Sequence, residues 1–163
     1  MIYYGVKMLE EKFVRVLKGD QEIVINKCHG GFGLSIEAVQ RYFELKNIPV
    51  WSEFDKKYPS LKLVTYWLVP PDADRIEGSP DNWHSMSLQE RRAHNASYEQ
   101  QVFTPRDIKR DDPVLVQVVK ELGSVANGSH AELKVVSVPA DVEWEIDEYD
   151  GLEWVAEKHR TWE

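Results

Sequence analysis

The amino-acid sequence predicts an α+β fold in a single domain, residues 1–163, with a mixed or antiparallel sheet and a C-terminal β-hairpin. Two segments, at about 35–46 and 113–122, place apolar residues at helical spacing and begin with capping residues. Other segments alternate apolar and polar residues, as half-buried strands do. The composition, 42% hydrophobic and 29% charged, is typical of a globular protein long enough to bury one core.

The first predicted element is a hairpin. Residues 12–17 and 22–26 are rich in apolar and β-branched side chains, and Gly19 and Asp20 between them favour a turn. A glycine-rich stretch, 26–35, then leads from strand to helix. Ser35 is a good N-cap for that helix, and Asn47 with Pro49 ends it.

The middle of the chain reads as a loop and a strand followed by a long polar segment. Residues 49–59 form the loop, anchored by aromatic side chains, and residues 61–69 form an apolar strand that stops at two prolines. Residues 70–105 are predicted to be a long loop, within which 87–101 can hold a short helix. Ser87 and Glu90 have the spacing of a capping box at its start.

The last third of the chain carries the best-defined helix. Asp112 caps it, Pro113 suits its first position, and Gly123 ends it. Residues 131–138 alternate as a strand, and the C-terminal hairpin follows, with its turn at 149–151. A short helix at about 153–158 is the alternative to the second hairpin strand.

Charge and composition restrict the function classes. The formal net charge is −8, and residues 141–157 hold eight acids and no Lys or Arg. This segment repels phosphate backbones, so direct nucleic-acid binding there is disfavoured. A basic protein partner is one interpretation, with a predicted interface at Glu145, Asp147, Glu148, Asp150 and Trp154. A solvated hairpin face is the other.

The glycine-rich turn is also the first candidate ligand site. Closely spaced glycines let backbone amides approach a ligand, and a helix start attracts anions. The pattern matches neither the P-loop nor the dinucleotide fingerprint, and a structural bend that admits Phe32 to the core is the alternative. The arginines before the second helix either grip a phosphate or belong to a structural helix start. The predicted ligand-binding set is Asn26, Lys27, Gly30, Gly31, Phe32, Gly33, Ser35, Arg106, Arg110 and Asp111.

Signals for catalysis, metals and export are weak. His159 begins a single H-x-T motif, so a phosphate-handling enzyme that uses His159 and Asp111 stays open as an alternative. The sequence contains no nucleophile elbow and no H-E-x-x-H. The lone Cys28 suggests neither a disulfide nor a zinc site, and no cofactor or metal is predicted. The first residues lack an export signal, and no apolar run is long enough for a membrane span.

Three stretches, residues 24–35, 110–123 and 148–162, together resemble a family of small uncharacterised proteins of phages and prophages. Residues 1–20 and much of 70–105 fall outside the resemblance and look like an N-terminal extension and an insertion. The resemblance implies a viral origin, a host-cytoplasmic location and, by analogy, a counter-defence role. The leading hypothesis is a non-enzymatic protein that binds a nucleotide-like anion. An acidic inhibitor of a host nucleic-acid-binding effector is the runner-up, and a homo-oligomer is an alternative to the monomer.

Overall fold

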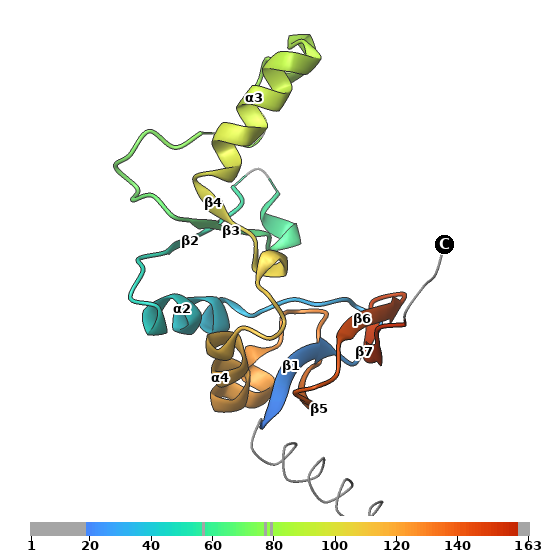
Figure 1. Ribbon diagram of the computed structural model, residues 1–163. Coiled ribbons are helices and arrows are strands. Elements are labelled where there is room, and N and C mark those ends of the chain that lie inside the picture. Colours follow the sequence, from blue (N-terminus) through green and yellow to red (C-terminus); the bar gives the residue numbers. More distant parts are fainter. Residues whose placement is uncertain (1–18, 57, 77, 79, 160–163) are drawn as a thin grey trace, which may run out of the picture. The chain divides into compact units, whose positions relative to one another are not determined.

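The computed structural model describes residues 19–56, 58–76, 78 and 80–159, and the fold is α+β with antiparallel strand pairing (Figure 1). The chain divides into two compact units. Unit 1 comprises Met1–Tyr42 and Ile108–Glu163, and unit 2 is the intervening Phe43–Asp107. Unit 2 is thus inserted into unit 1 along the chain. Whether the two units fold as one domain stays a prediction.

Unit 1 is built on an antiparallel strand pair, β1 (Asp20–Asn26) and β5 (Leu133–Pro139), drawn in blue and orange in Figure 1. The helix α4 (Pro113–Leu122) packs against both strands. Its apolar stripe is buried together with the middle of β1, and Ile23, Val24 and Leu115 are fully buried. The predicted first arm of the N-terminal hairpin, residues 12–17, lies outside the described residues.

Both predicted helices of this part of the chain are confirmed, with their caps. In α2 (Ile36–Leu45) the Ser35 hydroxyl accepts the Ala38 N–H at 3.0 Å, and Asn47 follows the helix with a φ of 54°. In α4 the Asp112 carboxylate accepts the Val114 N–H at 2.8 Å. These bonds satisfy amides that a helix start otherwise leaves unpaired.

An ion pair links the two helices within unit 1. The Arg41 guanidinium on α2 donates to the Glu121 carboxylate on α4 at 2.9 Å. This hydrogen bond lowers the pKa of Glu121 below its ordinary value. Both side chains are about one-third exposed, so the pair contributes little stability and mainly fixes geometry.

The C-terminal hairpin is also confirmed. Strands β6 (Trp144–Tyr149) and β7 (Leu152–Glu157) pair antiparallel around Asp150 and Gly151, both at positive φ (red in Figure 1). Two successive residues at positive φ are what a tight two-residue hairpin turn requires. The alternative of a short helix at 153–158 is wrong, because β7 occupies that segment in full register with β6.

Unit 2 contains a separate antiparallel sheet in the order β2–β3–β4, formed by Trp51–Phe54, Val64–Trp67 and Val102–Phe103. The predicted loop at 49–59 therefore holds a strand, because β2 pairs with β3 over its whole length. The predicted strand at 61–69 is shorter than expected. Lys62 has a φ of 50°, a left-handed conformation that interrupts extended backbone before Val64.

The segment 70–105 is more structured than a loop. It holds a 3-10 turn at Trp83–Ser85, the helix α3 (Leu88–Glu99) and strand β4. The capping box is present: the Glu90 N–H donates to the Ser87 hydroxyl, and the Ser87 N–H donates to the Glu90 carboxylate at 2.7 Å. No residue of α3 is buried. Across the part of the chain that the structure describes, no helix has both the length and the apolar composition needed to cross a bilayer.

Candidate functional site

The glycine-rich turn packs tightly against the segment just before β5. A Cβ atom on Gly30 would stand 1.7 Å from the carbonyl oxygen of His130, so any side chain there displaces the backbone. The Gly33 carbonyl accepts the Gly128 N–H at 2.9 Å, and the Ser35 N–H donates to Ala126 at 3.0 Å. These contacts favour the interpretation of the turn as a structural bend.

Asn26, predicted as a ligand residue, is fully buried and links three segments. Its side-chain amide donates to the carbonyls of Cys28 and Gly151, each at 2.6 Å, and its side-chain oxygen accepts the Glu132 N–H at 2.8 Å. The side chain thereby ties the end of β1 to the glycine-rich turn, to the hairpin turn and to the start of β5. Its polar atoms are occupied by the protein itself.

Arg110, predicted to grip an anion, is already paired with Glu153 of β7. Its Nη1 and Nη2 atoms donate to the two carboxylate oxygens at 2.9 and 2.8 Å, a bidentate arrangement. The side chains are only 17% and 7% exposed, and the guanidinium carbon lies 3.4 Å from the ring centroid of the buried Phe32. A ligand anion at Arg110 has to displace a carboxylate that the fold already provides.

The same ion pair covers the outer edge of β1. The Val24 N–H donates to the Arg110 carbonyl at 2.8 Å, and Arg110 Nη1 donates back to the Val24 carbonyl at 3.3 Å. The Asn26 N–H donates to Glu153 Oε2 at 2.8 Å. Backbone groups that a further strand would otherwise pair are therefore satisfied by one arginine and one glutamate. We call Arg110, Glu153 and Asn26 the edge latch.

A groove lies beside the latch, between the β1–β5 pair and β7. Its volume is about 320 Å³, and its lining residues are Ile25, Lys27, Lys134, Val136, Ser137, Val138, Trp154 and Val155. One end carries the two lysines, and aliphatic side chains with the partly exposed Trp154 line the rest. We call this the lysine groove. It combines apolar walls with a few charged groups, as ligand sites do.

The strand register explains why the two lysines meet. Ile25 pairs with Lys134, and Lys27 is two residues beyond Ile25, so both lysines lie on one face as diagonal neighbours. The Lys27 N–H continues the ladder by donating to the Glu132 carbonyl at 2.7 Å. Among the described residues neither lysine is in an ion pair.

The acids of the C-terminal hairpin divide between its two faces. Asp147 pairs across the hairpin with Trp154, and Glu145 lies on the same face as Asp147. That outer face also carries Tyr149, 71% exposed, and the four predicted interface acids are all exposed. Glu153 is the exception among the hairpin acids, since it turns inward to the edge latch.

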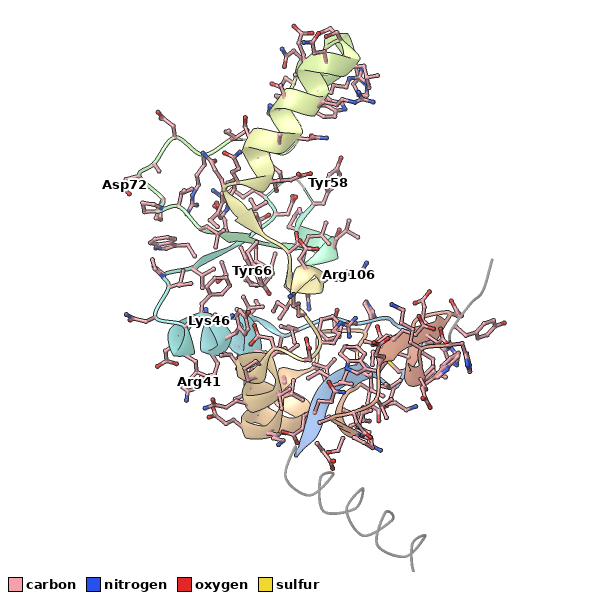
Figure 2. All side chains as sticks on the ribbon, in the orientation of Figure 1. Arg41, Lys46, Tyr58, Tyr66, Asp72 and Arg106 are labelled. Carbon is pink, nitrogen blue, oxygen red and sulfur yellow. The ribbon has the colours of Figure 1, made fainter. Side chains whose placement is uncertain are left out.

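Three other predicted residues do not join the groove. Arg106 belongs to unit 2, where it is exposed on a 3-10 turn, and Figure 2 labels it with Tyr66 and Asp72 of that unit. Asp111 and His159 are exposed in unit 1. The rest of the H-x-T motif, residues 160–161, lies outside the described residues. No group of three His, Cys, Asp or Glu side chains arranged for a metal ion occurs among the residues described.

Lys134 and the pairing of Glu153 are the site features that sequence reasoning missed. Lys134 carried a usable signal, because it is the only charged residue in an otherwise apolar and hydroxylic strand, β5. Glu153 carried none, because it stands among seven other acids of residues 141–157 and only the tertiary structure selects it.

Comparison of the chain with protein-family models, with curated proteins and with solved structures finds no match in any of the three.

Proposed function

We propose that this chain is a non-enzymatic accessory protein that binds a nucleotide-like anionic ligand in the lysine groove. The supporting observation is the pair of lysines, Lys27 and Lys134, on one face of the strand pair and in no ion pair among the described residues, in a groove that the partly exposed Trp154 also lines. Lysine ammonium groups bind phosphates as point charges, and an exposed indole offers a surface for a base. The sequence predicted the same class of ligand, but at the glycine-rich turn and not in the lysine groove.

The edge latch is the reason why the proposed site is the groove and not the glycine-rich turn. At the glycine-rich turn the Ser35 amide and the Arg110 fork are both satisfied within the protein. Removing the Glu153 carboxylate from Arg110 leaves a buried charge unpaired, which costs several kcal/mol. Lys27 is the predicted ligand residue that also lines the groove. The resemblance to phage proteins supports a counter-defence role in the host cytoplasm as part of the same proposal.

A titration of the 163-residue chain tests the proposal. Cyclic nucleotides, nucleoside monophosphates and ADP-ribose are added while tryptophan fluorescence and thermal shift are recorded. We expect binding tighter than millimolar for at least one ligand, weakened about tenfold or more by Lys134→Gln. Lys109→Gln, an exposed lysine outside the groove, is the matched control. Absence of any binding below millimolar would falsify the proposal.

A second candidate function is supported by the outer face of the hairpin. Glu145 and Asp147 share that face with two exposed aromatic rings, Tyr149 and Trp154, and this combination fits a basic protein surface. In this alternative the chain inhibits a host nucleic-acid-binding effector. Neutralising Glu145, Asp147, Glu148 and Asp150 together to the corresponding amides should abolish capture of that effector in a pull-down. Unchanged capture would dismiss this candidate and leave the groove proposal untouched.

A further inference from the structure

Resting on the proposed function, we propose that the lysine groove selects a single-ring-system phosphomonoester, of the class of nucleoside 5′-monophosphates. The juxtaposition behind this is the pair of lysines at one end of a small groove and Trp154 with three valines along the rest. The phosphate lies between Lys27 and Lys134, and the ring lies against Trp154.

The asymmetry of the groove gives the ligand its orientation. Along β5 the lining residues Lys134, Val136 and Val138 follow one another on one face, so charge is confined to the first of them. Trp154 and Val155 of β7 line the groove opposite β5. As consecutive strand residues they direct their side chains to opposite faces of the hairpin, so only one of them, Trp154, offers an aromatic ring to the ligand. A ligand that is anionic at one end and aromatic at the other fits this order, whereas a ligand with anions at both ends places one of them among valines.

Charge matching favours a phosphomonoester over a phosphodiester. A monoester carries close to two negative charges at neutral pH, with its second pKa near 6, and two unpaired ammonium groups match that charge. A cyclic or bridging diester carries one charge per phosphate. Glu132, whose backbone pairs with that of Lys27, brings an exposed carboxylate to the same end of the groove. Glu132→Gln is therefore expected to tighten binding of a dianion.

The volume of the groove also favours a nucleoside monophosphate over a larger ligand. The groove volume, about 320 Å³, stands at the lower end of the range of roughly 300–1,000 Å³ that ligand sites span. One ring system with one sugar and one phosphate is compatible with that volume. A dinucleotide or ADP-ribose, which carries a second sugar and phosphate, extends beyond it.

Calorimetric titration of the unaltered 163-residue chain at pH 7.5 with five probes tests the selection. The probes are adenosine 5′-monophosphate, cyclic adenosine monophosphate, ADP-ribose, adenosine and inorganic phosphate. We expect the monophosphate to bind at least about tenfold more tightly than each of the others. We also expect its affinity to fall as the pH is lowered through about 6, where the second phosphate proton is taken up.

Variants locate the two contacts. Lys27→Gln and Lys134→Gln should each weaken monophosphate binding about tenfold and leave adenosine binding unchanged. Trp154→Ala should weaken monophosphate binding by about tenfold and leave inorganic phosphate unchanged. Lys109→Gln and Tyr149→Ala, which change a lysine and an exposed aromatic outside the groove, should have no effect.

The outcomes separate this inference from the proposed function. Tighter binding of the cyclic nucleotide or of ADP-ribose, still dependent on Lys134, overturns the monoester selection and keeps the proposed function. Equal affinity for inorganic phosphate and the monophosphate shows that the ring makes no contribution to binding, and it also overturns the selection. If no probe binds below millimolar, both fail. Because the comparison of probes uses the unaltered chain, a variant that does not fold leaves the test intact.

Discussion

The helices α4 and α3 begin alike and end up in opposite environments. Both start at a polar side chain that accepts an amide of the first turn, Asp112 in α4 and Ser87 in α3. Yet α4 buries four residues of its apolar stripe, whereas α3 buries none, and its first residue, Leu88, is 66% exposed. The caps fix where each helix starts, while burial alone separates a core helix from a solvated one.

The segments that lead into the two helices differ as well. The residues before α4 are held by the Arg110–Glu153 pair, which is almost fully buried. Those before α3 are held by partly exposed contacts, such as Arg91 donating to the carbonyls of Trp83 and His84 at 3.1 Å. We therefore expect substitutions around α4 to change the global stability of unit 1, and substitutions around α3 to act locally. The predictions below test this contrast.

The largest effect is expected at the edge latch. Glu153→Gln leaves the Arg110 charge buried without its carboxylate, so it should lower the free energy of unfolding by about 3–5 kcal/mol. Chemical denaturation followed by tryptophan fluorescence measures this. The double variant Arg110→Met with Glu153→Leu removes both charges and should lose clearly less than Glu153→Gln alone. An equal loss in both variants would show that the charge is not buried in solution.

The next effect compares two leucines. Leu115 of α4 is fully buried, and Leu115→Ala should cost about 2–5 kcal/mol through lost burial and the cavity left behind. Leu88→Ala in α3 should change the free energy of unfolding, measured in the same denaturation experiment, by less than about 0.5 kcal/mol, because that side chain is mostly in water. Similar costs at the two positions would mean that α3 is covered in solution by another surface.

The third largest effect is expected at the N-terminal cap of α3. Ser87→Ala removes the hydroxyl that accepts the Glu90 N–H, and it should cost α3 about 0.5–2 kcal/mol of helix stability. Amide hydrogen exchange across α3 should speed up while exchange in β1 and α4 stays as it was. Ser87→Asp is the matched control, since a carboxylate also caps well. Faster exchange throughout unit 1 would contradict a local role.

The smallest effect is a pH dependence of the same cap. Hydrogen bonds from the Ser87 side chain and backbone hold the pKa of Glu90 below its ordinary value of 4.5. A folded-state pKa below the unfolded one adds stability that is present above about pH 4.5 and is lost as pH falls through the folded pKa. Exchange in α3 should therefore accelerate in acid. Glu90→Gln should remove that pH dependence, and persistence of the dependence would assign it to another group.

Much of the fold was predictable because it rests on local signals. The caps at Ser35, Ser87 and Asp112, the hairpin turn at Asp150 and Gly151 and the alternation in β6 all act within a few residues. Strand β2 was missed because its four residues are extended only through pairing with β3. Of the two groove lysines, Lys27 was among the predicted ligand residues, whereas Lys134 is a neighbour more than one hundred residues away that only strand pairing brings near.

Taken alone, the sequence determined the α+β class, the helix starts and the acidic hairpin, because propensity, capping and charge are properties of short stretches. Tertiary structure alone decided which charged residues form ion pairs with one another. Arg110 and Glu153 lie 43 positions apart and neutralise each other at the edge of β1, so the expected anion grip became a structural element. Lys27, directly after β1, and Lys134 of β5 lie on one face of the strand pair and form no ion pair among the described residues, since antiparallel register, and no local rule, sets which side chains share a face.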